Sequence, residues 1–353
     1  MRIAQIAPLY ESVPPQYYGG TERVVSYLTE ELCRLGHEVT LFASGDSRTT
    51  AELVPGTPRA LRLDDATIDL LAHHIVMLEK VYRRAAEFDV AHFHIDYLHY
   101  PLSRRQALPH VTTLHGRLDI PDLVPVYQEF AEMPVVSISD SQREPLHWIN
   151  WQGTVHHGLP EQLFHLHEEP GSYLAFLGRI SPEKRVDRAI EIAKRTRQPL
   201  RIAAKVDKVD REYFTREIEP LLDHPLVEYI GEITDLEKED FLGHASALLF
   251  PIDWQEPFGL VMIEAMACGT PVIAWRNGSV PEVMEPGRTG FIVADIDAAV
   301  AAVGRIDEVS RTGCRAWFEE HFTAARMAAD YLAIYERLVS RRGISRLGER
   351  ANA

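Results

Sequence analysis

The sequence has little of what several classes of protein need. Its three cysteines, Cys33, Cys268 and Cys314, are far apart and odd in number, so they predict neither a zinc site nor a disulfide framework and indicate a reducing compartment such as the cytoplasm. No run reaches the roughly 18 apolar residues of a transmembrane helix, and the apolar stretch after Met1 is too short for a signal peptide. The formal net charge of −15 argues against a nucleic-acid partner, which usually meets a basic surface.

What the sequence does contain is an alternation of short apolar runs with helical patterns, which is typical of parallel α/β sheets. The predicted strands of the first half are Arg2–Ala7, Glu38–Ala43, Val90–His94, Val111–His115, Pro134–Ser139 and Thr154–His157. Those of the second half are Tyr173–Leu177, Leu200–Val206, Val227–Ile230, Ala247–Phe250, Pro271–Ala274 and Gly290–Val293. With 353 residues, the chain therefore suits two Rossmann-sized α/β domains.

The alternation is interrupted once, and this break predicts the domain boundary. The segment from Leu159 to Gly171 is rich in His, Glu and Pro and has no clear period, so it is interpreted as a linker. We predict one domain over residues 1–160 and a second over 161–322. An amphipathic helix over about 323–342 follows the second domain.

The most informative motif is E-P-F-G-L-V-M-I-E-A-M-A-C-G-T-P-V-I-A, which begins at Glu256. Gly269-Thr270-Pro271 ends its apolar helix and leads into a strand. Glu264 lies inside that helix, and a buried charge is costly unless a partner stabilises it. Glu256 lies on the loop before the helix and after a strand that ends at Pro251. The motif therefore lies at the carboxyl edge of a sheet, where open α/β folds bind ligands, and the helix N-terminus suits a phosphate.

Two cations are predicted at the same kind of edge. Arg179 and Lys184 follow the first strand of the second half, and Pro182 and Glu183 begin a helix between them. Arginine offers a planar fork for phosphate oxygens, and lysine offers a compact charge. The alternative is a surface network of Arg179, Glu183 and Lys184, which would contribute little. The glutamates at 256 and 264 favour the phosphate site.

Two glycines, Gly19 and Gly20, join the first strand to the first helix, for which Thr21 is the expected cap. Glycines let the backbone approach a ligand, and the helix N-terminus favours negative charge. The alternative is a plain strand-to-helix turn. The motif is not G-x-G-x-x-G, so a nicotinamide dinucleotide is disfavoured.

Histidines end two of the predicted strands, at His92 and His94 and at His115. A zinc site of these three is conceivable, but no acidic or water-activating motif accompanies them, and we predict no metal site. The D-x-D from Asp295 to Asp297 opens a helix and is better explained as a cap. A structural role is expected for His92. The following polar and aromatic residues could bind an acceptor or form a solvated loop: His94, Asp96, Tyr97, His99 and Tyr100.

Taken together, these motifs resemble those of the retaining nucleotide-sugar glycosyltransferases of the GT-B architecture, specifically glycosyltransferase family 4, whose hallmark is E-x₇-E. The resemblance implies two Rossmann-like domains that face a cleft, with the last helix crossing back onto the first domain. The catalytic residues that it implies are Arg179, Lys184, Glu256 and His115. The donor-binding residues that it implies are Gly19, Gly20, Phe258, Gly259, Leu260 and Glu264.

The resemblance also assigns roles to these residues. Glu256 would contact the donor sugar, Glu264 the ribose hydroxyls, and Arg179 and Lys184 the diphosphate. His115 would meet the sugar from the first domain, and the two glycines would lie against the diphosphate. Bacterial glycogen and starch synthases place a lysine where this chain has Tyr17, which together with the short length argues against a glucan synthase.

We therefore predict a retaining hexosyltransferase that uses a nucleoside diphosphate sugar, a UDP-sugar in the first instance, without a metal or other cofactor. The acceptor, whether a saccharide, a lipid-linked group or a small molecule, is not predicted. Three alternatives remain: a sugar-nucleotide epimerase of the same fold, a phosphorylase, and a non-catalytic carbohydrate-binding relative. The epimerase would form product without an acceptor, and the phosphorylase would need inorganic phosphate or a pyridoxal lysine. Glu256, Arg179 and Lys184 argue against the non-catalytic relative.

Overall fold

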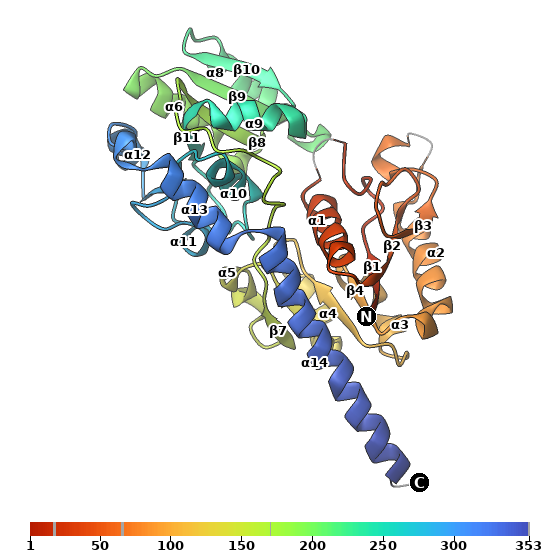
Figure 1. The fold of residues 1–353 in the computed structure, drawn as a ribbon. Coiled ribbons are helices and arrows are strands. Elements are labelled where there is room, and N and C mark those ends of the chain that lie inside the picture. Colours follow the sequence, from red (N-terminus) through yellow and green to blue (C-terminus); the bar gives the residue numbers. More distant parts are fainter. Residues whose placement is uncertain (17–18, 65–66, 170, 352–353) are drawn as a thin grey trace. The chain divides into compact units, whose positions relative to one another are not determined.

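The computed structural model describes residues 1–16, 19–64, 67–169 and 171–351. Its contacts divide the chain into two compact units (Figure 1). The first unit comprises Met1–Gly158 together with Ala324–Ala353, and the second comprises Leu159–Thr323. The sequence placed the boundary after residue 160, close to the division that the contacts give. In the part of the chain that is described, no helix is both long and apolar enough to cross a membrane.

The first unit is built on a seven-stranded sheet in the order β3-β2-β1-β4-β5-β6-β7, in which every neighbouring pair is parallel. The strands are β1 Arg2–Ile6, β2 Glu38–Ser44, β3 Glu52–Thr57, β4 Val90–Phe93, β5 His110–Thr113, β6 Val135–Ser137 and β7 Trp151–Thr154. The order of the strands reverses between β1 and β4. Open sheets of this kind bind ligands beyond the carboxyl ends of the strands at such a reversal.

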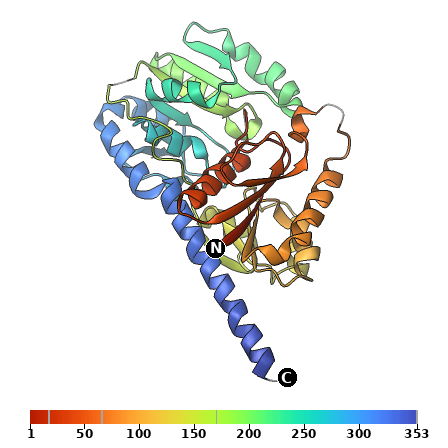
Figure 2. The ribbon, with the colours of Figure 1, turned by 45° about the vertical axis from the view of Figure 1, so that its right-hand side comes forward.

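Helices cover both faces of this sheet. They are α1 Gly20–Arg34, α2 Leu70–Arg83, α3 Tyr100–Ser103, α4 Leu123–Glu129, α5 Asp140–Arg143 and α14 Ala324–Ala351. Because side chains alternate along a strand, Ile6 packs with Met77 of α2 on one face, while Ala7 packs with Val25 of α1 on the other. Figure 2 shows α1 and α2 on either side of the sheet. The last helix, α14, contacts α1, β4 and β5, so it belongs to the α1 face.

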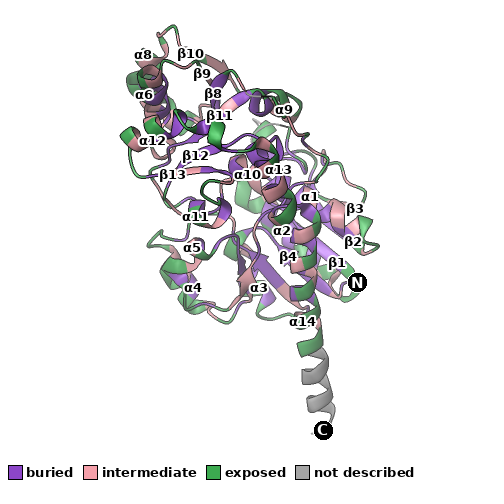
Figure 3. Ribbon diagram, turned by 60° about the vertical axis from the view of Figure 1, so that its left-hand side comes forward, coloured by how far each residue is buried: buried purple, intermediate pink, exposed green. Residues whose placement is uncertain are grey.

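The second unit repeats this arrangement with a six-stranded parallel sheet in the order β10-β9-β8-β11-β12-β13. Its strands are β8 Tyr173–Arg179, β9 Leu200–Lys205, β10 Val227–Gly231, β11 Ala245–Phe250, β12 Val272–Trp275 and β13 Gly290–Val293. Its helices are α6 Val186–Thr196, α7 Arg211–Tyr213, α8 Glu219–Leu222, α9 Asp235–Gly243, α10 Leu260–Ala267, α11 Val280–Val283, α12 Ile296–Val303 and α13 Arg311–His321. The central strands of both sheets are largely buried (Figure 3), whereas the edge strands β3, β7 and β10 are mostly intermediate or exposed. Here the order reverses between β8 and β11.

The structure corrects several sequence-based boundaries. Strand β3 was not predicted because Pro55 and Gly56 indicate a loop, but β3 lies at the edge of its sheet, where proline costs no ladder hydrogen bond. Strand β7 lies earlier than the predicted 154–157. Helix α1 begins at Gly20 with Gly19 as its N-cap, so Thr21 is not the cap. The last helix continues to Ala351, beyond the predicted end at 342.

Candidate functional site

The fold of the second unit places the predicted cations beside the predicted glutamates. Arg179 is the last residue of β8, and the loop from Pro251 to Gly259 follows β11, so both leave the sheet where the strand order reverses. The two segments are joined through the backbone, because the N–H of Asp253 donates to the carbonyl of Glu183 at 2.8 Å. The topology therefore assembles at one edge residues that are far apart in the sequence.

The centre of this site is an ion pair between Lys184 and Glu256. The Lys184 ammonium group contacts Oε2 of Glu256, and the indole N–H of Trp254 donates to the same oxygen at 2.9 Å. The ammonium group also lies 5.1 Å from the centre of the Trp254 ring and 5.6 Å from that of Phe250, distances at which cation–π attraction operates. Glu256 is buried and Lys184 half-buried. A lysine is thus held at the switch point of the sheet.

The segment Asn277-Gly278-Ser279 fixes the backbone of the glutamate loop. Gly278 has a φ of +55°, and a Cβ at this position would lie 2.3 Å from backbone atoms of Glu256. The N–H of Ser279 donates to the Glu256 carbonyl at 3.0 Å, and its hydroxyl donates to the Phe258 carbonyl at 2.7 Å. This close approach explains why a glycine is needed between Asn277 and Ser279.

Arg179 is surrounded by carboxylates. Its guanidinium group lies 2.5 Å from Glu183, 3.6 Å from Asp207 and 3.5 Å from Asp210. Burial raises the pKa of Asp210, although the charge of Arg179 opposes the shift. Lys205, whose role the sequence left open, pairs with Asp207 at 3.2 Å. Of the surface network that the sequence offered as the alternative, the Arg179–Glu183 pair is therefore present, whereas Lys184 pairs with Glu256 instead. A phosphate at Arg179 would have to compete with the carboxylates around it.

The buried glutamate of the apolar helix has the partner that its burial requires. Glu264 is 3% exposed, and the ammonium group of Lys238 on α9 contacts its Oε1 at 2.8 Å. Lys238 also lies 3.4 Å from Asp235. The cost of burying a charge predicts a cation near Glu264, but the sequence could not identify Lys238, because the contact depends on how α9 packs against α10.

The residues between the two glutamates divide between the core and the helix start. Phe258 is buried and packs edge-on against Phe322, with ring centroids 6.1 Å apart. Gly259 has a φ of +79° and caps α10, and Leu260 is the half-buried first residue of that helix. The side chain of Phe258 therefore has a packing role, and the donor contacts of Phe258, Gly259 and Leu260 stay predictions.

In the first unit, close packing against Pro15 explains why residue 19 is a glycine. It precedes α1, and a Cβ at this position would lie 2.8 Å from the Cβ of Pro15. This geometry suits the plain strand-to-helix turn that was the alternative reading, and Gly20 opens the helix. The role of both glycines at a diphosphate stays a prediction. Tyr17, which argued against a glucan synthase, lies outside the described residues.

His115 follows β5 and is held by other histidines. Its Nε2 lies 2.9 Å from Nδ1 of His94, and its ring stacks on His157 with centroids 5.3 Å apart. Burial lowers the pKa of His115 to about 3, so the imidazole is neutral near pH 7. Its Nδ1 is buried and has no hydrogen-bond partner among the described residues.

Two further histidines of the first unit, His92 and His99, are held in its core. His92 is fully buried and bonds Thr113 and Tyr335. His99 stacks on Phe93 at 3.7 Å, and Tyr100 is buried, so the predicted acceptor loop retains only Asp96 and Tyr97 as exposed members. Within the described ranges, no cluster of three or more His, Cys, Asp or Glu side chains could hold a metal ion. The carboxylate of Asp295 caps α12 through the N–H of Ala298, as predicted.

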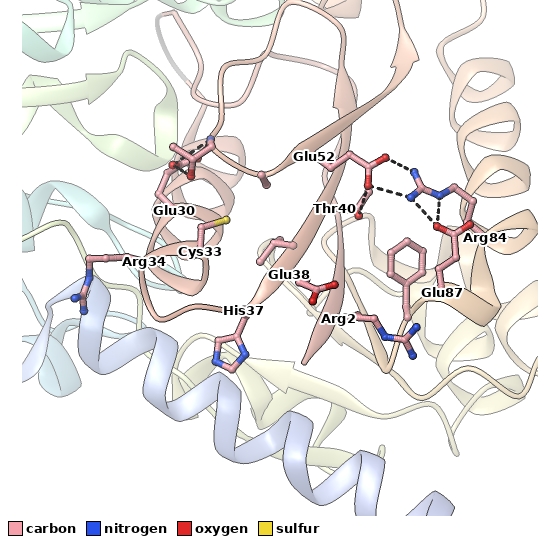
Figure 4. Close-up of a pocket in the computed structure, with 14 residues that line it drawn as sticks. Arg2, Glu30, Cys33, Arg34, His37, Glu38, Thr40, Glu52, Arg84 and Glu87 are labelled. Carbon is pink, nitrogen blue, oxygen red and sulfur yellow. Dashed lines mark hydrogen bonds and ion pairs between the residues drawn. The ribbon is translucent and has the colours of Figure 1, made fainter.

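A pocket of about 820 Å³ lies elsewhere in the first unit, beside β2 and β3 (Figure 4). Its charged walls bond one another: Arg84 pairs with Glu52 at 2.8 Å and with Glu87 at 2.7 Å. None of the predicted site residues lines it. The pocket therefore does not enlarge the candidate site.

Two family models match the chain, one in each unit. A family model described as glycosyl transferases group 1 matches residues 162–313, and one described as glycosyltransferase family 4 matches residues 18–152. The alpha-maltose-1-phosphate synthase of Mycolicibacterium smegmatis is 24% identical over 96% of this chain and 100% of its own length. The MMP alpha-(1->4)-mannosyltransferase of Mycolicibacterium hassiacum is 36% identical over 31% of this chain and 28% of its own.

Solved structures match over almost the whole chain. Sucrose-phosphate synthase from Thermosynechococcus elongatus has a TM-score of 0.77 at 20% identity, covering 97% of this chain and 100% of its own. HepE of Anabaena, in complex with UDP and glucose, has a TM-score of 0.72 at 17% identity, covering 96% and 100%. At these identities the structural likeness shows the fold, and the two family models together span most of the chain. The chain belongs to glycosyltransferase family 4 and is a glycosyltransferase of the GT-B fold.

Proposed function

We propose that this glycosyltransferase moves a hexose from a nucleoside diphosphate sugar, in the first instance a UDP-sugar, to an acceptor, and that it retains the configuration of the anomeric carbon. The observation that carries the proposal is the Lys184–Glu256 pair, which joins the turn after β8 to the loop after β11. A cation for a leaving phosphate and a carboxylate for sugar hydroxyls are adjacent there. A UDP donor is supported by HepE, a fold relative that binds UDP and glucose.

Transfer of the sugar requires groups that stabilise the charges formed when its bond to the diphosphate breaks. When the bond between the anomeric carbon and the phosphate oxygen breaks, positive charge develops on the sugar ring and negative charge on the diphosphate. Lys184, Arg179 and the N–H groups at the start of α10 would stabilise the diphosphate. The acceptor oxygen bonds to the anomeric carbon on the same face, and its proton passes to the leaving phosphate oxygen. No protein base is assigned.

Both cations reach the leaving group by exchanging partners. Lys184 and Arg179 already contact carboxylates, so a diphosphate must draw them away from Glu256 and Glu183. At Lys184 the attraction favours this exchange, because a diphosphate carries more charge than the single carboxylate of Glu256. At Arg179 the diphosphate competes with three carboxylates, those of Glu183, Asp207 and Asp210. We further propose that the cations take the place of a divalent metal. The free thiols of Cys33, Cys268 and Cys314 support a reducing compartment such as the cytoplasm.

The configuration of the product tests the proposal. The enzyme is supplied with an α-linked nucleotide sugar and an acceptor found by screening, and the anomeric coupling constant of the first-formed product is measured. An α product is expected. A β product would contradict retention and would make His115 the candidate base. Conversion of the nucleotide sugar without any acceptor would instead identify an epimerase.

A further inference from the structure

A continuous chain of buried hydrogen bonds joins the last helix to His115. Tyr331 of α14 bonds Thr113 at 2.8 Å, and Thr113 bonds His92 at 2.7 Å. His92 bonds Tyr335 of α14 at 2.6 Å, and Tyr335 bonds Gln5 of β1 at 3.1 Å. Gln5 bonds His94 at 2.9 Å, and His94 bonds His115 at 2.9 Å. The members of this chain before His115 are all buried: Tyr331, Thr113, His92, Tyr335, Gln5 and His94.

The imidazoles in the chain are neutral. Burial lowers the pKa of His92 and His94 well below the usual range, and the neighbouring histidines add to the effect. A neutral imidazole carries one N–H donor and one bare nitrogen that accepts. A histidine that donates from one ring nitrogen must therefore accept at the other, so the donor–acceptor direction of one hydrogen bond fixes that of the next.

The amide of Gln5 sets this direction. Its NH₂ group donates to the hydroxyl oxygen of Tyr335, which leaves its carbonyl oxygen to accept from Nε2 of His94. Nδ1 of His94 is then the bare nitrogen, and it accepts from the Nε2–H of His115. Nδ1 of His115, which is buried and without a partner among the described residues, is in turn left as a bare acceptor.

The phenol of Tyr335 makes this direction consistent at the other end. Its oxygen accepts from Gln5, so its own hydrogen is available for Nδ1 of His92. Nε2–H of His92 can then donate to Thr113, and the threonine hydroxyl to Tyr331. Every bond from His115 to Tyr331 runs donor to acceptor in one sense, so no buried donor along this path opposes another.

We propose that Gln5, oriented by Tyr335, is a positioning residue that fixes the tautomer of His115, so that Nδ1 accepts a hydrogen bond from a hydroxyl group of the transferred sugar. The identity of the ligand rests on the proposed function, whereas the tautomer does not. The site then favours a ligand group that donates a hydrogen bond over one that can only accept, because only a donor satisfies the bare nitrogen.

Nitrogen NMR of the protein without ligand tests the tautomer. Histidine labelled with ¹⁵N is incorporated, and the His115 signals are assigned from their loss in His115→Gln. Long-range proton–nitrogen correlations then show which ring nitrogen carries the proton. Protonated Nε2 and bare Nδ1 are expected for His115. A proton on Nδ1 would mean that the Gln5 amide is reversed and the chain runs in the opposite sense, which overturns the proposal.

Three variants test the role of Gln5. Gln5→Leu removes the acceptor for His94, so His94 is expected to move its proton to Nδ1 and to convert His115 to the Nδ1–H tautomer. Gln5→Glu keeps an acceptor oxygen and should preserve the original tautomer. Ser103→Ala, which cuts a separate buried network around His99 and Tyr82, is the matched control and should leave His115 unchanged. An unchanged His115 in folded Gln5→Leu would overturn the proposal, and the wild-type spectrum decides it if that variant does not fold.

Binding of UDP-glucose and its deoxyfluoro analogues tests the ligand. Fluorine cannot donate a hydrogen bond, so the analogue altered at the hydroxyl that meets His115 should bind about tenfold more weakly than UDP-glucose. In His115→Ala this difference should disappear. Equal binding of all analogues to the wild type would overturn the hydroxyl assignment. A failure of UDP-glucose itself to bind counts against the donor proposed above and leaves the spectrum to decide the tautomer.

Discussion

The two units of this enzyme share a sheet topology but stabilise their interior polar groups in different ways. In the first unit, buried histidines, tyrosines and a glutamine bond one another as neutral groups. In the second, buried glutamates are held by lysines, as in Lys184–Glu256 and Lys238–Glu264. The neutral hydrogen bonds of the first unit all run from donor to acceptor in one sense, which suits the recognition of one hydroxyl group of a ligand. In an ion pair, the lysine can leave its glutamate and pair with another anion, which suits the stabilisation of a leaving diphosphate.

The largest difference between the units should appear in acid. The fully buried histidines among the described residues, His74, His92, His94, His99 and His157, all lie in the first unit. Burial lowers the pKa of each. They are neutral in the folded state and take up protons on unfolding once the pH falls below the ordinary histidine value of about 6.5.

The free energy of unfolding of the first unit should therefore fall as the pH drops below about 6.5, by up to about 1.4 kcal/mol per pH unit for each buried imidazole. Hydrogen exchange at pH 7.5 and 5.5, corrected for the intrinsic pH dependence of amide exchange, should show β4 and β5 losing protection before β11 and β12. Equal losses in the two units would contradict the comparison.

Removing the central cation of the second unit should have the next largest effect. Lys184→Met keeps much of the side-chain volume but removes the charge aimed at the leaving group, so kcat should fall about 10²–10³-fold. Arg179→Ala should act in the same direction. Arg195→Ala, which breaks an exposed pair with Asp297, is the control and should leave kcat unchanged. Near-normal turnover in both site variants would return these residues to a surface network.

The two glutamates of the second unit should differ from each other. Glu264 is assigned to the ribose and Glu256 to the transferred sugar, and free UDP contains only the ribose. Glu264→Gln should therefore weaken UDP binding about tenfold, while Glu256→Gln should change it little. Titration calorimetry with UDP measures both, and melting temperatures control for loss of the buried pairs. A larger loss at Glu256 would reverse the assignment.

The smallest expected effect is that of chelation. If Lys184 and Arg179 serve the diphosphate, an excess of chelator should leave transfer unchanged, and magnesium or manganese should add nothing. Transfer is measured with and without chelator on the same preparation. Activity that is lost and then restored by a divalent ion would show that the cations of the second unit are not sufficient.

The contrast between the units also separates what the sequence could predict from what it could not. The alternating apolar runs indicated two parallel α/β sheets, and Glu256, Glu264, Arg179 and Lys184 stood out because each is a charge placed at a strand end or in an apolar helix. Their partners Lys238 and Trp254 could not be identified, since these contacts depend on how the loops and helices pack. The edge strand β3 was hidden by Pro55 and Gly56.

In the first unit, the sequence singled out His115 but not the buried hydrogen bonds that link it to Gln5 and Tyr335. Gln5 and Tyr335 are separated by 330 positions, and a lone glutamine in a strand gives no local signal of a polar partner. The packing of α14 against β4 and β5 brings Tyr335 within hydrogen-bond distance of both Gln5 and His92. Contacts of this kind lie beyond any pattern that is read along the chain.

The return of α14 to the first unit has a consequence for synthesis on the ribosome. The first unit is encoded at both ends of the chain, with the whole second unit between them. Until Tyr335 has been synthesised, Gln5 and His92 lack the hydroxyl group that they share in the folded protein. The polar atoms that later bond this hydroxyl must bond water in the meantime. The first domain to emerge is thus completed after the second, when the last helix leaves the exit tunnel.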